Sequence, residues 1–150
     1  MENNLTLEAL KTAFPSAEVN QGTEFPTITA NPAHYQYIAQ TLRDQFGFNL
    51  LLNMTGVDEA PQLTIICHLR NIETKQLLVL RTSTEDREHP LIETLSQLWP
   101  AAIYFEREIY DLIGITFNNH PDMRRIFLDD DYPGFPLRKD FKDAINTLEN

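Results

Sequence analysis

The stretch FNLLLNMTGVDEAPQLTIICHLRNIETKQLLVLRT, residues 48–82, decides the fold class that this sequence predicts. It contains three runs that are rich in β-forming residues: Phe48–Val57, Leu63–Arg70 and Gln76–Thr82. The polar segments between them, Asp58-Glu59-Ala60-Pro61 and residues 71–75, are typical of turns. Because connections this short join antiparallel neighbours, the stretch predicts an antiparallel meander.

The chain before this meander predicts two helices and two short strands. In order, these are a helix from Leu5 to Phe14 that Pro15 stops, strands at Glu18–Asn20 and Phe25–Ala30, and a helix to about Phe46. Asn31-Pro32 supports the start of the second helix, because asparagine caps helix N-termini and proline suits the first helical position. Gly47 is placed to end that helix.

Two more helices are predicted after the meander. They are a helix introduced by His89-Pro90 through Leu91, Leu95 and Leu98 and broken at Trp99-Pro100, and a helix from Ala102 to Ile113 that ends at Gly114. The whole order predicts an α+β fold, in which a two-layer domain packs helices on a mixed sheet and an extended irregular C-terminal strap follows. We place the core of this single domain at residues 1–117 and the docking strap at residues 118–150.

Composition and charge exclude several classes of protein. With 150 residues, 42% of them hydrophobic and 23% charged, the chain is typical of one globular domain with its own core. The formal net charge of −10 argues against nucleic acid, because phosphate contacts need clustered lysine and arginine. No run approaches the roughly 18 apolar residues of a membrane span. The first basic residue is Lys11, unlike a secretory signal, so we expect an intracellular location.

The candidate catalytic and metal-ligating residues lack the spacing that their chemistry needs. The four histidines, His34, His68, His89 and His120, show no zinc-site spacing. Cys67, the only cysteine, lies in a predicted strand where packing is expected, and an iron–sulfur cluster held by one chain needs about four ligands. Asp129-Asp130-Asp131 lacks the pattern of a calcium loop, so a solvated turn or a patch facing a basic partner is favoured. We expect no catalytic, cofactor-binding or metal-binding residue.

The segment from Glu106 to Phe141 is instead typical of a docking surface. Half of the chain's twelve basic residues lie in its last third, and the strap alternates them with aromatic residues. Arginine and aromatic side chains dominate interface hot spots, and an irregular strap adds little to a free-standing domain. We therefore expect the segment to lie against a partner; the alternative is that it folds back on its own domain. Arg107 and Asp111, four residues apart, are expected to pair on an exposed helix face.

The same segment resembles the signature of a known family. The matching residues are Glu106-Arg107-Glu108, Asp111, Gly114-Ile115, Phe117, His120-Pro121, Arg124-Arg125-Ile126, Gly134 and Pro136-Leu137-Arg138-Lys139-Asp140-Phe141. This pattern is similar to that of the thirty-kilodalton (C-type) subunit of respiratory complex I, the proton-pumping NADH:quinone oxidoreductase. Weaker likeness extends back to about Phe48. The chain departs from the family at Asn119, where a small residue such as glycine is usual.

The resemblance implies a role inside an electron-transfer complex. The family's subunit is a two-layer α+β protein of the peripheral arm and binds no redox cofactor, whereas its complex uses FMN, iron–sulfur clusters and a quinone. It packs beside the forty-nine-kilodalton-type subunit that helps to form the quinone site, named the quinone-site subunit below, among neighbouring iron–sulfur subunits. It would lie at the cytoplasmic face of the inner (plasma) membrane, attached only through the complex. On this basis we expect the partner-contacting residues to be Glu106, Arg107, Glu108, Asp111, His120, Arg124, Arg125, Phe135, Arg138, Lys139, Asp140 and Phe141.

Two alternatives remain open. The equivalent subunit of a related membrane-bound nickel–iron hydrogenase, or of a ferredoxin- or F420-linked dehydrogenase, carries a similar signature. The more distant alternative is an autonomous metal-dependent hydrolase that uses His120, Asp122 and the cluster Asp129–Asp131. The activity that copurifies with the chain would separate these possibilities.

Overall fold

Three helices and seven strands make up residues 6–142, which are the residues that this computed structural model describes. They are α1 (Leu7–Ala13), β1 (Glu18–Gln21), β2 (Pro26–Ala30), α2 (Pro32–Asp44), β3 (Leu50–Glu59), β4 (Gln62–Arg70), β5 (Leu77–Thr84), β6 (Leu91–Glu93), α3 (Ala102–Ile113) and β7 (Thr116–Asn118). Leu5 of the first predicted helix and residues 143–150 of the predicted strap lie outside the described residues.

The main sheet grows from the predicted meander. β3, β4 and β5 pair antiparallel, with Cys67 of β4 opposite both Met54 and Leu80. β2 adds to β5 in parallel and β1 adds to β2 antiparallel, so the strand order is β1-β2-β5-β4-β3. Because α2 carries the chain from β2 to the far edge of the sheet, the meander can return and fill the space between β2 and β3. The predicted α+β class with a mixed sheet is confirmed.

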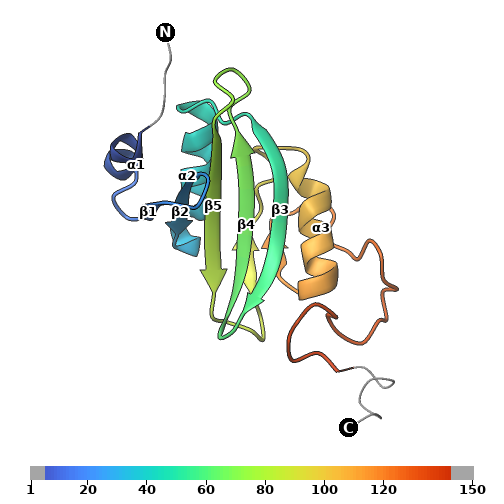
Figure 1. Ribbon diagram of the computed structural model, residues 1–150. Helices are drawn as coiled ribbons and strands as arrows, with labels where there is room; N and C mark the ends of the chain where they lie inside the picture. Colours follow the sequence, from blue (N-terminus) through green and yellow to red (C-terminus); the bar gives the residue numbers. More distant parts are fainter. Residues whose placement is uncertain (1–5, 143–150) are drawn as a thin grey trace.

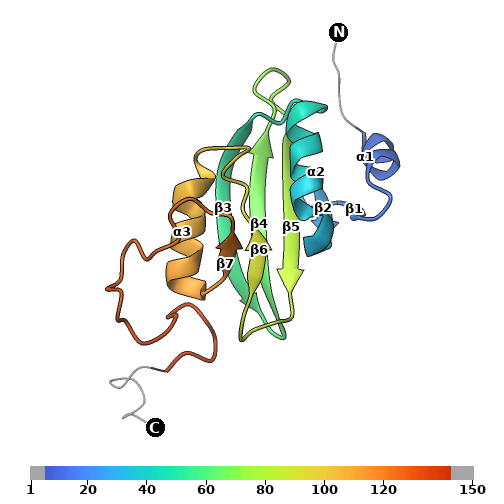
Figure 2. The ribbon, with the colours of Figure 1, turned by 180° about the vertical axis from the view of Figure 1, so that it is seen from behind.

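Helices cover one face of this sheet and leave the other face open. Figure 2 shows α2, α3 and the pair β6–β7 in front of the strands, whereas Figure 1 shows the strands uncovered from the opposite side. Burial along β4 alternates accordingly: Ile65, Cys67 and Leu69 are fully buried, and Ile66 and His68 between them are partly exposed. The core therefore lies between the sheet and the helices, in the predicted two layers.

Local signals in the sequence set both ends of α2. The side chain of Asn31 accepts a hydrogen bond from Ala33 N–H at 2.9 Å, and Pro32 occupies the first helical position. The helix buries Tyr35 and other apolar residues against the sheet. It ends at Asp44, slightly before the predicted boundary, and Gly47 follows in the left-handed conformation with a φ of 77°.

The helix predicted after His89-Pro90 is wrong. Residues 91–93 form β6 and pair in parallel with β7, placing Ile92 opposite Phe117. The leucine spacing does not describe one apolar face, because Leu95 is fully buried while Leu91 is 54% exposed. Backbone pairing with a strand that lies beyond α3 in the sequence decided this conformation, and a local pattern carries no information about such a partner.

The turn predicted at residues 58–61 is shorter than expected. Asp58 and Glu59 remain in β3, where Glu59 pairs with Gln62 of β4. Only Ala60-Pro61 makes the connection, with a cis peptide bond. Asp58 has the polar character of a turn residue, yet it is a strand residue that is buried on the side of the sheet that the strap approaches.

Gly56 lets α3 lie close against β3. A Cβ atom at this position would meet Cγ2 of Ile109 at 2.7 Å and Cγ1 of Ile113 at 3.3 Å. We expect Gly56→Ala to lower the free energy of unfolding by about 1–3 kcal/mol, as overpacking does in other cores. Urea denaturation measures this, with Thr55→Ala as the control, since Thr55 is exposed on the opposite face. Equal losses in the two variants would contradict the proposed close packing.

Candidate partner interface

The described part of the strap, residues 118–142, runs beside α3 of its own chain (Figures 1 and 2). Leu137 N–H donates to the carbonyl oxygen of Leu112 at 2.9 Å, and polar side chains of α3 bind several other backbone groups of the strap. On sequence grounds an irregular strap needs another molecule for these groups. Much of the strap is instead satisfied by its own chain, so its inner side is occupied and only its outer side is free.

Asp111 is the centre of this attachment. Its buried carboxylate accepts hydrogen bonds at Oδ2 from the N–H groups of Ile126, Phe127 and Leu128, at 3.3, 2.7 and 3.1 Å. Oδ1 accepts a bond of 3.0 Å from the Arg125 guanidinium. Burial alone raises the pKa of Asp111, but the bonds from Phe127 N–H, Arg125 and the other strap N–H groups outweigh burial and hold that pKa below its usual value. The carboxylate therefore stays charged at neutral pH.

Arg107 and Arg125 complete the attachment from the two sides. Arg107 donates to the carbonyl oxygens of Arg124 and Arg125 at 3.1 and 2.9 Å. Arg125 donates to those of Tyr132 and Gly134 at 3.1 and 2.8 Å, which closes residues 125–134 into a loop. The predicted pairing of Arg107 with Asp111 on an exposed face is wrong. The strap covers this face, and each of the two side chains binds the strap instead.

A second attachment ties the end of the strap to the sheet. Asp58 of β3 accepts two bonds from the Arg87 guanidinium, at 2.8 and 2.7 Å, and one from Lys139 N–H at 2.9 Å. The bond from Arg87 is the main reason that the pKa of Asp58 lies well below its usual value. Arg138 donates to the carbonyl oxygens of Ile113 and Arg87, at 2.6 and 2.8 Å. The strap is thus fixed near both of its ends.

Phe135 packs where α3 ends. Gly114 has a φ of 87°, and a Cβ atom there would lie 2.5 Å from the Phe135 ring. The guanidinium carbons of Arg125 and Arg138 lie 4.9 and 5.4 Å from the centre of the same ring. Glycine at the end of the helix therefore serves two needs, because it provides the left-handed turn and leaves room for the aromatic side chain.

Glu106 is a second buried acid on α3, and its surroundings differ from those of Asp111. Its carboxylate accepts hydrogen bonds from the Thr94 hydroxyl and from Leu95 N–H, the latter at 2.8 Å. No lysine or arginine within residues 6–142 pairs with it, and burial raises the pKa of Glu106 to about 7. The nearest cationic candidate is His120, whose Nε2 lies 3.9 Å away. Glu106 thus ties α3 to the segment after β6.

His120 is held as a neutral imidazole. Its Nδ1 accepts a hydrogen bond from Asp122 N–H at 2.9 Å, so the proton resides on Nε2, which donates to the carbonyl oxygen of Ile103 at 2.9 Å. The preceding residue, Asn119, has a φ of 66°. This left-handed conformation suits glycine and is tolerated by asparagine, which explains the departure at this position from the resembling signature.

The structure divides the expected partner-contacting residues into three groups by exposure. The buried residues are Glu106, Arg107 and Asp111; the partly buried residues are His120, Arg125, Phe135, Arg138 and Phe141; and the exposed residues are Glu108, Arg124, Lys139 and Asp140. A partner can meet the exposed group directly. The buried group can serve an interface only by holding the strap in place.

Apolar side chains on the outer surface of α3 and the strap were not among the expected contact residues. Phe127 is 64% exposed, and Tyr104, Leu137 and Ile126 also lie at the surface. The available signal was the run Ile126-Phe127-Leu128, which lies outside any predicted helix or strand and therefore has no regular element to pack it.

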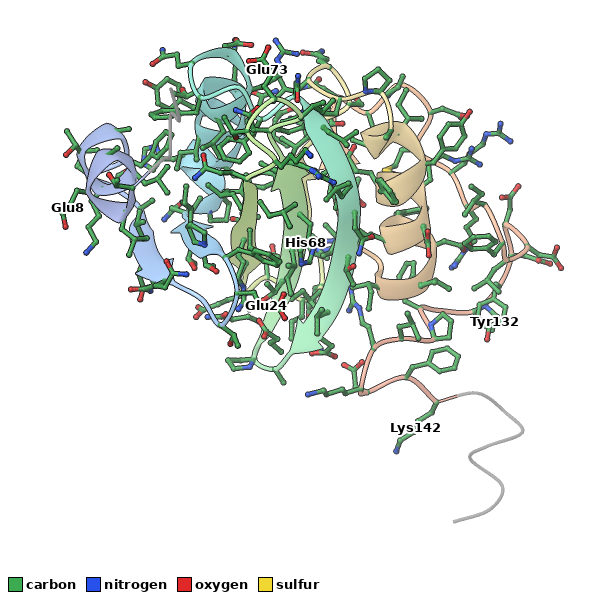
Figure 3. All side chains as sticks on the ribbon, turned by 45° about the horizontal axis from the view of Figure 1, so that its top comes forward. Glu8, Glu24, His68, Glu73, Tyr132 and Lys142 are labelled. Carbon is green, nitrogen blue, oxygen red and sulfur yellow. The ribbon has the colours of Figure 1, made fainter. Side chains whose placement is uncertain are left out.

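Catalytic and metal-binding chemistry has little material at this interface. Within residues 6–142, no three His, Cys, Asp or Glu side chains are grouped as a metal site would require. Burial raises the pKa of the Cys67 thiol to about 12, and its sulfur lies 3.3 Å from the Tyr35 hydroxyl in the core. Figure 3 shows His68 over the strands and Tyr132 on the strap beyond α3. Among the described residues, no helix combines the length and apolar character of a membrane span.

Comparisons with known proteins agree with the resemblance seen in the sequence. The model of a family described as "Respiratory-chain NADH dehydrogenase, 30 Kd subunit" matches residues 28–146. The C-type subunit of the NADH-quinone oxidoreductase of Moorella thermoacetica is 36% identical over 138 residues, which are 91% of this chain and 93% of that protein. The fused C/D protein of the NADH-quinone oxidoreductase of Phocaeicola vulgatus is 42% identical over 108 residues, which are 71% of this chain and 21% of that longer protein.

A solved structure shares the fold. It is a chain of the membrane-bound sulfane sulfur reductase, an archaeal respiratory membrane complex, with a TM-score of 0.80 and 22% sequence identity. The match covers 95% of this chain and 86% of that chain. At this level of identity the likeness establishes the fold and leaves the activity to other observations.

Replacing Asp111 tests the central attachment. We expect Asp111→Asn to cost about 3 kcal/mol at neutral pH, because it leaves the Arg125 guanidinium without its buried partner. The depressed pKa means that this stabilisation is full above the unfolded pKa, about 4, and is lost as the pH falls through the lower folded value. Urea denaturation measures both effects. Asp122→Asn, which removes an exposed pair with Arg124, is the control, and equal unfolding midpoints for the two variants would contradict this assignment.

Replacing Glu106 tests the opposite pH dependence. A folded pKa of about 7 lies above the unfolded value of about 4.3, so the proton is bound more tightly in the folded state. Stability from this group is full at low pH and is lost as the pH rises through 7. We expect wild-type protein to lose about 2–3 kcal/mol relative to Glu106→Gln between about pH 5 and 8. Parallel unfolding curves over this range would show that Glu106 does not titrate there.

Proposed function

This chain belongs to the family of the 30 Kd subunit of the respiratory-chain NADH dehydrogenase, and from this premise we propose that it is a non-redox scaffold of that complex. Its relatives are subunits of an NADH-quinone oxidoreductase. In this proposal the chain lies in the peripheral arm of complex I and supports the quinone-site subunit, the forty-nine-kilodalton type. The outer side of the strap and the exposed face of α3 form the contact.

The fused relative is the observation that carries this proposal. The C/D protein of Phocaeicola vulgatus is 42% identical to this chain over a region that makes up only 21% of its length. Two subunits can be joined in one chain without loss of function only if the linked ends lie within reach in the complex. The fusion therefore supports a direct neighbour relation between a C-type and a D-type subunit, and we take the D-type partner to be the quinone-site subunit.

The residues of this chain fit a structural role in electron transfer. With one cysteine, the chain has too few thiolates for a cluster of its own, since such a cluster needs about four ligands. FMN, iron–sulfur clusters and quinone would be bound by other subunits, and the chain would hold those subunits in register. We further propose a peripheral position at the cytoplasmic face of the inner (plasma) membrane, with attachment only through partners.

A related complex is the second candidate. The fold shared with a chain of the membrane-bound sulfane sulfur reductase shows that this architecture also occurs in another respiratory membrane complex. An equivalent subunit of a nickel–iron hydrogenase or of a ferredoxin- or F420-linked dehydrogenase would have the same fold. The autonomous hydrolase gains no support, because both ring nitrogens of His120 are already hydrogen-bonded within the protein and Asp122 pairs with Arg124.

Copurification from membranes tests the proposed function. We expect the tagged chain, extracted in a mild detergent, to retain the quinone-site subunit, the iron–sulfur subunits and NADH-driven quinone reduction. Mass spectrometry of every retained chain and a quinone-reduction assay are the measurements. Hydrogen or ferredoxin turnover in place of NADH oxidation would favour the second candidate. Recovery of the tagged chain alone, while the rest of the complex remains intact elsewhere, would contradict both.

A further inference from the structure

The loop at residues 125–134 is built internally before any partner is present. Asp111 binds three consecutive N–H groups at one end, and Arg125 binds the carbonyl oxygens of Tyr132 and Gly134 at the other. A loop held by buried charged groups loses little conformational freedom when it binds, because most of its backbone is already fixed. Such a loop is suited to rigid recognition and differs from a segment that folds on contact.

Phe127 is the feature that this loop presents. Its backbone N–H makes the shortest of the three bonds to Asp111, 2.7 Å, yet its side chain is 64% exposed. The neighbouring Ile126 is 36% exposed. A large aromatic ring on a fixed backbone brings contact area with only two rotatable side-chain bonds to order, which is why such residues dominate binding hot spots. The internal packing of this chain gives Phe127 no burial that would explain an aromatic residue here.

The residues that follow Phe127 define the chemistry of the surface it would meet. Asp129, Asp130 and Asp131 are all exposed, and none of their carboxylates forms a salt bridge within residues 6–142. The sequence places these charges within two to four positions of Phe127 on the same closed loop. A matching surface needs an apolar depression bordered by lysine or arginine, because like charges opposite these aspartates would be repelled.

We infer that Phe127 inserts into an apolar pocket of the quinone-site subunit and that Asp129–Asp131 pair with a basic border of that pocket. This inference rests on the proposed function, because it takes its partner from there. Asp111, Arg107 and Arg125 are positioning residues in this arrangement: they hold the loop and do not touch the partner.

Direct binding of the full chain to the purified quinone-site subunit tests this inference. We expect Phe127→Ala to weaken binding about 10- to 100-fold, the range of a hot-spot residue, with an unchanged melting temperature. The matched control is Tyr37→Ala, since Tyr37 is 66% exposed on α2 and away from the strap. Biolayer interferometry gives the dissociation constants and the dissociation rates, in which the loss should appear.

The acidic residues need a separate variant with a charge-matched control. We expect the triple change Asp129→Asn, Asp130→Asn and Asp131→Asn to weaken binding at low salt and to flatten its dependence on sodium chloride. The control is Glu8→Gln, Glu24→Gln and Glu73→Gln, which changes net charge equally at exposed positions away from Tyr132 and the strap (Figure 3). Equal salt dependence in the two triple variants would overturn the basic border.

The outcomes separate this inference from the function on which it rests. If the wild-type chain binds the quinone-site subunit and Phe127→Ala binds equally well, the inserted ring is overturned while the scaffold role stands. If Tyr37→Ala and Phe127→Ala weaken binding equally, the contact is not specific to the loop, and the inference again fails. If the wild-type chain does not bind this partner at all, the proposed function itself fails.

Discussion

The buried carboxylate of Asp111 is the interaction on which the form of the C-terminal region depends. It carries a full charge in the protein interior, where an unpaired ion is very costly, and it is stabilised by one guanidinium and three backbone N–H groups. All of these donors come from the strap. The helix that carries Asp111 is itself fixed closely against β3 through Gly56. The sheet therefore sets the position of α3, and α3 sets the position of the strap.

Two buried acids on the same helix titrate in opposite directions for a definite reason. Asp111 has a cation and three N–H donors, so hydrogen bonding outweighs the cost of burial and its pKa falls. Glu106 has one hydroxyl and one N–H, without a bonded cation, so burial prevails and its pKa rises to about 7. Burial alone does not tell which of them is charged. The number and charge of the donors decides it, and these donors come from distant parts of the chain.

Much of the fold was predictable because its signals are local. The three strands of the meander alternate with turn residues, Asn31-Pro32 starts α2, and Gly114 ends α3. The site was less predictable. The resemblance selected the right segment of sequence, but it could not separate residues that hold the strap from residues that face outward. β6 was missed for a similar reason, since three residues gain a strand conformation only from β7.

The sequence by itself determined the family, the α+β class and the position of the charged strap, because these depend on local propensity and on an ordered set of residue types. The tertiary structure alone decided which way those residues point. Arg107 and Asp111 have the spacing of a surface ion pair, yet both are buried by the strap, and Phe127 is left exposed beside them. The physical reason is that burial and pairing are set by whatever packs against a side chain. In this protein that neighbour lies in a part of the chain whose course no periodicity predicts.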